Sequence, residues 1–168
     1  MANKILLAYA SKYGSTQEVA EAIAKTMREK GLDVDLQPAS QVRSLEEYSA
    51  VVLGAPLYLY RWHKHAIRFL NRHEKALKNL PAAVFAIGPS FNGDEKEWLE
   101  TRDQFRKELA KFPWFKPVEA EVMGGKFDPA NLSFPMKYFL KDLPAADLRD
   151  WDAIAAWAAD VAAKLQAK

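Results

Sequence analysis

The sequence predicts an α/β protein built on a doubly wound parallel sheet of five strands in the order 2-1-3-4-5, with helices on both faces. Strand-like and helical segments alternate along the whole chain. The strand-like segments are apolar almost throughout, as in parallel sheets that are covered on both faces. The length of 168 residues suits one domain of ordinary size, which we assign to residues 1–168.

The composition argues against several other classes of protein. Hydrophobic residues make up 49% of the chain and charged residues 27%, as is typical of folded proteins and not of disordered or collagen-like ones. The apolar runs are far shorter than a bilayer span, and no secretory signal precedes the first strand. The absence of cysteine excludes disulfides and thiolate chemistry and fits a cytoplasmic protein. A net charge of +2 gives no argument for a nucleic-acid partner.

The sequence predicts five strands and, after the first of them, an amphipathic helix. The strands are expected at Lys4–Tyr9, around Val34 and Leu36, at Tyr48–Gly54, at Ala82–Gly88 and at Pro117–Gly124. The first helix follows the first strand. Ser15 is its candidate N-cap, Glu18 sits three residues on as in a capping box, and Gly31 ends it. Its apolar positions fall on one face: Val19, Ile23 and Met27.

Three more helices follow the third, fourth and fifth strands. They are expected from about Trp62 to Asn79, from Asp94 to Lys111 and from Asp152 to Leu165. The first of them has Ala66, Phe69, Leu70, His73 and Leu77 on its buried face. The second has Trp98, Arg102, Phe105 and Leu109 at helical spacing, and the last buries Ile154, Trp157, Val161 and Leu165.

Sheets of this kind bind ligands at the carboxyl ends of their strands, at the point where the strand order reverses. The first loop at this edge is Ser11-Lys12-Tyr13-Gly14-Ser15-Thr16, which leads into a helix N-terminus. Free backbone N–H groups, the helix dipole and three hydroxyls favour a phosphate there. The loop has neither the G-x-G-x-x-G nor the G-K-[ST] pattern, so a terminal phosphomonoester suits it better than a dinucleotide or a nucleoside triphosphate. The alternative is a capped helix with a polar loop.

The loops after the third and fourth strands complete this edge. The segment from Gly54 to Trp62 is dense in aromatic residues, and the segment from Gly88 to Asp94 is rich in turn-forming residues. Flat apolar walls of this kind suit an aromatic ring system. The alternative interpretation is that the aromatic residues pack in the core and that Asp94 caps the following helix.

The pattern S-x-x-G-S-T between a strand and a helix resembles the FMN phosphate loop of the flavodoxin family, T-x-T-G-x-T. Ser11, Gly14 and Thr16 match it, and Tyr13 stands where the family often has threonine. The resemblance implies non-covalent FMN, with Tyr58 at the position of the aromatic residue that stacks on the isoalloxazine ring and Gly54 allowing close approach of the ring. For Tyr60 and Trp62, ring contact and core packing both remain open. The implied FMN contacts form three groups: Ser11, Lys12, Tyr13, Gly14, Ser15 and Thr16; Pro56, Leu57, Tyr58, Leu59 and Tyr60; and Gly88, Pro89, Ser90, Phe91, Asn92 and Gly93.

A basic stretch distinguishes this chain from flavodoxins that only carry electrons, which are usually strongly acidic. Residues 61–78 hold six Lys or Arg and three His against one Glu, and Lys64, Arg68 and Arg72 share one helix face. This face either attracts an anion, such as propionates, an acidic partner or a lipid headgroup, or is simply solvated. His63 and His65 are the candidate proton donors near the ring. His73 is expected to be packed in the core, and no metal site is expected because the histidines lack matching carboxylates.

A long segment from Lys126 to Pro144 follows the last strand and mixes aromatic residues with lysines. Such a segment can lie on a membrane surface or line an apolar substrate site. Alternatively, its aromatic side chains pack on the edge of the sheet. We expect this packing for most of them and exposure for some.

With the basic stretch at residues 61–78 and the segment from Lys126 to Pro144, the chain resembles the quinone-dependent protoporphyrinogen oxidase branch of the flavodoxin-like superfamily. That resemblance implies an enzyme in which FMN takes hydrides from a porphyrinogen and passes electrons to a membrane quinone, with peripheral contact at the inner face of the membrane and a homodimer as further expectations. One alternative is a flavodoxin that carries single electrons between protein redox partners. Another is a flavin-free binding module, because the fold does not fix the function.

Overall fold

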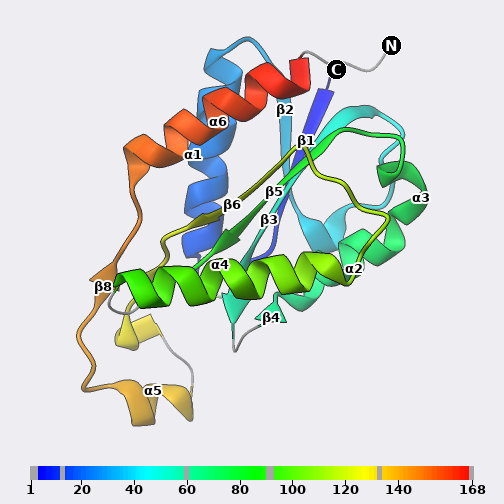
Figure 1. The fold of residues 1–168 in the computed structure, drawn as a ribbon. Helices are drawn as coiled ribbons and strands as arrows, with labels where there is room; N and C mark the ends of the chain where they lie inside the picture. The colour runs from blue at the N-terminus through cyan, green and yellow to red at the C-terminus, as the bar shows by residue number, and fades with distance from the viewer. Residues whose placement is uncertain (1–3, 12–13, 59–60, 90–92, 132–133, 167–168) are drawn as a thin grey trace.

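The computed structural model describes the chain except for residues 1–3, 12–13, 59–60, 90–92, 132–133 and 167–168. Its parallel strands run in the order β2-β1-β3-β5-β6, which confirms the predicted order 2-1-3-4-5 (Figure 1). The strands are β1 (Lys4–Tyr9), β2 (Asp33–Pro38), β3 (Tyr48–Tyr58), β5 (Ala82–Ile87) and β6 (Glu119–Met123). A short strand, β4 (Arg61–Trp62), pairs antiparallel with the end of β3.

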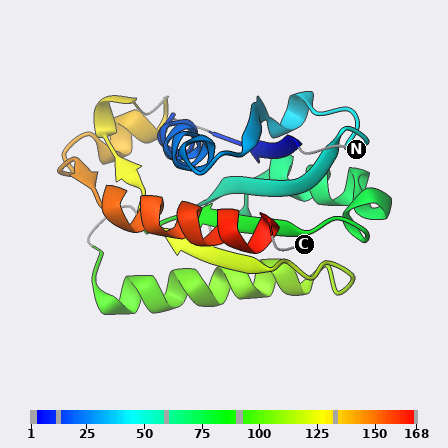
Figure 2. The same ribbon diagram turned by 90° about the horizontal axis from the view of Figure 1, so that it is seen from above.

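Helices cover both faces of the sheet, as the sequence predicts. On one face, α1 (Ser15–Glu29) and α6 (Trp151–Gln166) pack against each other and against the apolar side of the strands. On the other face lie α2 (Lys64–Arg72), α3 (Glu74–Leu77) and α4 (Glu95–Ala110). Figure 2 shows the strands of the sheet running beneath the long α6 helix. The interior strand β5 is buried along its whole length because both faces are covered.

The apolar faces predicted for α1 and α6 are confirmed: Val19, Ile23 and Met27 of α1 and Ile154, Val161 and Leu165 of α6 are all buried. The start of α1, however, differs from the prediction. Its N-cap is Gly14 in the left-handed conformation at φ 90°, with no side-chain cap, so the capping box that begins at Ser15 is wrong. The carboxylate of Glu18 accepts a hydrogen bond from Arg149 Nη1 at 2.8 Å instead.

The single helix predicted from Trp62 to Asn79 is also wrong. Trp62 lies in β4, and the helix breaks at His73 into α2 and α3. Contacts with distant residues hold Trp62 in the strand: its Nε1 donates to the carbonyl oxygen of Ala55 at 2.9 Å, and its backbone N–H donates to Glu108 Oε2 at 3.2 Å. The indole is 2% exposed and meets the ring of Phe105 edge-on. Of the two interpretations of Trp62, core packing is therefore the correct one.

The segment after β6 forms β7 (Lys126–Phe127), the short helices η2 (Pro129–Asn131) and α5 (Met136–Leu140), and β8 (Ala146–Asp147), which pairs with β7. It lies beyond the carboxyl ends of the sheet strands (Figure 1). The prediction that most of its aromatic side chains pack on the sheet edge is wrong. Phe127 is buried, but Phe134, Tyr138 and Phe139 are 84%, 63% and 71% exposed, and no residue of α5 is buried.

Candidate functional site

The loop after β1 leads into the N-terminus of α1, a position in a fold that favours an anion. Gly14 takes a left-handed conformation, and its N–H donates to Ser11 Oγ at 2.9 Å, which closes the loop against the start of α1. The N–H groups of the first turn of a helix have no acceptor within the helix and carry the positive end of its dipole. Thr16 is 1% exposed at this helix start. The structure thus brings Ser11, Gly14, Ser15 and Thr16 together, while Lys12 and Tyr13 lie outside the described residues.

The end of β3 lies directly beside this loop, because the N–H of Ala10 donates to the carbonyl oxygen of Gly54 at 2.9 Å. The sequence interpretation gave Gly54 the role of letting a ring approach. The structure gives a different reason, since a Cβ at this position would lie 1.9 Å from Cζ of Phe85. Gly54 is therefore required by the packing of the core.

The antiparallel pair of β3 and β4 places Tyr58, the residue predicted to stack on the ring, at the carboxyl edge of the sheet. β3 continues past its predicted end to Tyr58, which pairs with Arg61 of β4, and the N–H of His63 donates to the carbonyl oxygen of Pro56 at 3.0 Å. Tyr58 is 36% exposed at the end of β3. Pro56 and Leu57 are half-buried, and Leu59 and Tyr60 lie outside the described residues.

The third loop is fixed at both ends. Gly88 and Pro89 are buried and hydrogen bonded to the chain after β6: the N–H of Gly88 donates to Met123 at 2.8 Å, and Pro89 accepts from Gly125 at 2.8 Å. At the other end, Gly93 adopts φ 67°, and its N–H donates to the carboxylate of Glu97. Ser90, Phe91 and Asn92 lie outside the described residues.

At the N-terminus of α4, Asp94 is the N-cap, which confirms the capping interpretation of this residue. Its side chain accepts a hydrogen bond from the N–H of Glu97 at 2.8 Å, as an N-cap does. Asp94 is thus explained by the start of the helix.

The three histidines have different environments. His63 is the N-cap of α2, where its Nδ1 accepts from the N–H of His65 at 3.1 Å. His65 lines a cavity beside η1 (Ala39–Gln41), and burial together with nearby Lys64 and Arg68 lowers its pKa. His73 is buried, as predicted, at the C-terminal end of α2. The lowered pKa of His65 favours its neutral form over its charged form.

Sequence reasoning missed an ion-pair network that fixes the last loop to the site. The side chain of Arg149 is 5% exposed and bridges Asp147 and Glu18, with N–O distances of 2.8 Å to each. This network joins the chain after β8 to the first turn of α1. These residues carry no motif, and Glu18 is remote from the other two in sequence, so nothing in the sequence pairs them.

Among the residues that the structure describes, no three His, Asp or Glu side chains gather in a way that could hold a metal ion. Within the same residues, no helix has both the length and the apolar character needed to cross a bilayer.

Comparison with known proteins agrees with this geometry. Residues 6–144 match the flavodoxin domain. Protoporphyrinogen IX dehydrogenase [quinone] of Escherichia coli K12 is 23% identical, over 95% of this chain and 94% of that protein. The protein of the same name from Leishmania major is 25% identical over 95% of this chain and 75% of that protein.

Among solved structures, oxidised flavodoxin 2 from Bacillus cereus superposes with a TM-score of 0.63 at 22% identity, covering 96% of this chain and 99% of that one. A flavodoxin from the domain Archaea gives a TM-score of 0.59 at 16% identity, covering 97% and 99%. The likeness to these two structures establishes the fold. Since the flavodoxin domain spans most of the chain, from β1 to the end of the segment that carries α5, the protein belongs to the flavodoxin family of FMN-binding domains.

Proposed function

We propose that the protein binds FMN and acts as a protoporphyrinogen IX dehydrogenase that passes electrons to a quinone. The observation that carries the enzymatic part is the exposed aromatic segment at the carboxyl edge of the sheet, which a plain electron carrier does not require. The likeness to the two dehydrogenases, which extends over almost the whole chain, supports the same proposal.

The loop after β1 fits the phosphate of FMN. Ser11 Oγ accepts one hydrogen bond and can still donate its own hydrogen, and Thr16 brings a second hydroxyl to the start of α1. With the first-turn N–H groups of α1, these residues would hold the phosphate dianion. Tyr58 would face the flavin ring as an apolar wall. When bound, the flavin supplies the two-electron redox chemistry, and the protein supplies its position and surroundings.

The remaining loops would shape the space around the ring. Gly88 and Pro89 are buried and held to the chain after β6 by backbone hydrogen bonds, so the base of this loop is rigid. Gly125 also accepts from the N–H of Leu148 at 2.9 Å, which attaches the chain after β8 to the same place. These elements would exclude water from one side of the ring and leave the side toward α5 open for a substrate.

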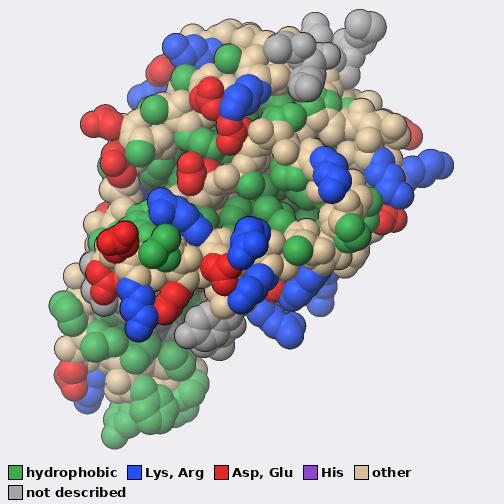
Figure 3. All heavy atoms as spheres, in the orientation of Figure 1, with side chains coloured by type: hydrophobic (Ala, Val, Ile, Leu, Met, Phe, Trp, Pro, Cys, Tyr) green, Lys and Arg blue, Asp and Glu red, His purple; other side chains and the backbone are tan. Residues whose placement is uncertain are grey.

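The α5 segment is the part of the molecule suited to a membrane surface. Phe134, Tyr138 and Phe139 are exposed beside Lys137 and Lys141, and Figure 3 shows hydrophobic side chains gathered at the end of the molecule that α5 forms. Aromatic rings and lysines together favour the boundary between lipid headgroups and acyl chains. A quinone dissolved in the bilayer would then lie near the carboxyl edge of the sheet.

An anaerobic reaction tests the proposed activity. The FMN-loaded protein is mixed with protoporphyrinogen IX while the absorbance of oxidised flavin is followed, and a menaquinone analogue is then added. We expect the absorbance to bleach and then to recover with the quinone. Absence of bleaching in a protein that dithionite reduces normally would refute the activity.

Binding to vesicles of anionic phospholipid tests the membrane contact. The triple variant Phe134→Ser, Tyr138→Ser and Phe139→Ser is expected to lose co-sedimentation with the vesicles. Leu99→Ser is the matched control, because Leu99 on α4 is 57% exposed and lies outside the segment. Equal binding by both variants would contradict the proposed contact.

The alternative function is one-electron transfer between protein partners, which the likeness to flavodoxin structures favours. A carrier would be reduced and reoxidised by redox proteins and would not react with the porphyrinogen. The anaerobic reaction therefore separates the two functions.

A further inference from the structure

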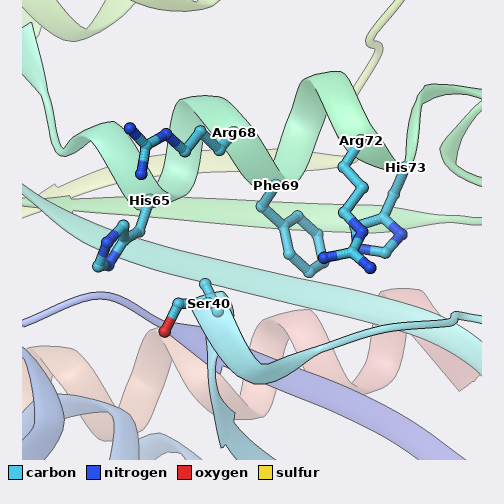
Figure 4. A pocket seen from close by; sticks show the side chains of 7 residues that line it. Ser40, His65, Arg68, Phe69, Arg72 and His73 are labelled. Carbon is cyan, nitrogen blue, oxygen red and sulfur yellow. The ribbon is translucent and has the colours of Figure 1, made fainter.

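A cavity of about 160 Å³ lies between η1 and α2, and none of its lining residues belongs to the loops assigned to the cofactor. The helix contributes residues at spacings of three and four, which places them on one side of α2. Figure 4 shows the side chains of His65, Phe69 and Arg72 directed from α2 toward the segment that carries Ser40. The lining consists of Ala39, Ser40, His65, Arg68, Phe69, Arg72 and His73.

The lining is positively charged. Arg68 and Arg72 stand four residues apart on one helix, a spacing at which like charges destabilise each other. The lining contains no carboxylate, and neither arginine forms an ion pair with another residue of the described chain. Arg68 lowers the pKa of His65 and Arg72 lowers that of His73, in each case after the larger effect of burial. The field in the cavity is therefore cationic at both of its ends.

His73 adds a polar atom without a described hydrogen-bond partner to the lining of the cavity. The residue is 7% exposed, and its Nε2 is buried without a hydrogen-bond partner among the described residues. A hydrogen bond with the backbone of Val42 engages the ring and raises its pKa, against the effects of burial and of Arg72. Buried polar nitrogens nearly always have a partner, because an unsatisfied one costs free energy. An oxygen atom held in the cavity would supply that partner.

We infer that this cavity is a second ligand site, which binds the oxyanion of a phosphate or carboxylate group. The guanidinium groups of Arg68 and Arg72 provide planar pairs of N–H donors that match such oxygens, and Ser40 of η1 lines the cavity opposite α2. The cavity is smaller than the usual 300–1,000 Å³ of sites for drug-sized ligands, so it takes a small anion or the anionic end of a larger molecule.

The inference goes beyond the proposed function and does not depend on it. The cavity shares no residue with the three loops assigned to FMN, and its test reads out binding rather than turnover. Failure of porphyrinogen oxidation would leave it standing, and failure of anion binding would leave the proposed activity standing.

The test is a titration of the purified protein after saturation with FMN, so that the phosphate loop is occupied. If FMN does not saturate the protein, the flavin content of the sample is measured before the titration. Inorganic phosphate is added at constant ionic strength, set with sodium chloride, while the imidazole NMR signals of His65 and His73 are followed. We expect both signals to shift saturably and the pKa of His73 to rise when phosphate binds. A merely structural histidine would not respond in this way.

A pair of double variants decides whether the site is specific. The double variant Arg68→Gln, Arg72→Gln is expected to weaken phosphate binding about tenfold or more, because both guanidinium groups are lost. Lys75→Gln with Lys78→Gln removes the same charge from exposed positions outside the cavity and is expected to leave binding unchanged. Equal weakening by the two variants, or the absence of a saturable shift in the wild type, would overturn the inference.

A parallel titration with succinate distinguishes the sources of the oxyanion. Tighter binding of succinate than of phosphate assigns the site to a carboxylate-bearing molecule, and the reverse assigns it to a phosphate. Either result supports an oxyanion site. Binding of neither anion refutes it.

Discussion

Substitution of Gly54 by alanine tests whether the core of the sheet requires glycine at that position. The new Cβ would lie 1.9 Å from Cζ of Phe85, about 1.5 Å short of the 3.4 Å at which ordinary van der Waals contact begins. It would also lie 2.2 and 2.3 Å from Cε1 and Cε2. The methyl group would thus occupy the space of the ring itself.

The ring of Phe85 has little room to move. The residue is fully buried and meets the ring of Trp157 edge-on, with 5.8 Å between centroids. Inserting a methyl group into a packed core typically costs about 1–3 kcal/mol. We expect Gly54→Ala to lie at the upper end, about 3 kcal/mol, because the whole ring must shift rather than one terminal atom.

A double-mutant cycle isolates this clash from other effects. Phe85→Ala alone is expected to cost about 3–5 kcal/mol, because it leaves a cavity. In that background Gly54→Ala should cost close to nothing, since its methyl group enters the vacated space. The free energies of unfolding of the four proteins are measured without FMN by urea denaturation, and Phe85→Leu replaces Phe85→Ala should the latter fail to fold.

Additive costs in the cycle would refute the packing argument. So would a Gly54→Ala protein that keeps its stability without FMN and loses only the affinity for FMN. That second outcome would return Gly54 to the role of admitting the flavin ring.

The attachment of β8 and the buried hydroxyl of α1 allow three further tests. Gly124→Ala should detach β8, because its Cβ would lie 2.0 Å from the carbonyl oxygen of Leu148; amide exchange in β8 should then accelerate about tenfold or more while exchange in β1 stays unchanged. Acid should release β8 as well: hydrogen bonds from Arg149 lower the pKa of Asp147 below its ordinary 3.8, so this stabilisation is present above that value and is lost as the pH falls through the lowered one. Protection factors measured between about pH 5 and about pH 2 should fall in the wild type and be low at all pH values in Arg149→Ala. Thr16→Val should weaken FMN binding about tenfold in a fluorescence titration with no loss of folding, and an unchanged affinity would contradict its assigned role.

Most of the fold could be predicted because its signals are local. The apolar run from Lys4 to Tyr9 is a strand with those bounds, and the periodic apolar residues of α6 are its buried face. The convergence of three loops at one edge also followed from the alternating pattern, because parallel strands end at the same side of a sheet.

The errors arose where a residue's place depends on distant partners. Trp62 has the spacing of a helical residue, but Ala55 and Glu108 hold it in a hairpin. Tyr138 and Phe139 are 63% and 71% exposed, which their apolar character alone does not reveal. The cavity beside η1 likewise depends on a packing contact between segments that are separate in sequence.

The contacts of the segment after β6 also set how the molecule would stand on a surface. Gly125 is hydrogen bonded to the base of the loop after β5, and Arg149 bridges to the first turn of α1, so α5 is fastened on both sides of it to the carboxyl edge. A surface that holds α5 would therefore lie at the carboxyl edge of the sheet, with the opposite edge directed away from it. The hydrogen bond of Gly125 and the ion pairs of Arg149 would therefore set the orientation of the whole domain on a surface. A molecule that moves along such a surface would keep the carboxyl edge of the sheet turned toward it.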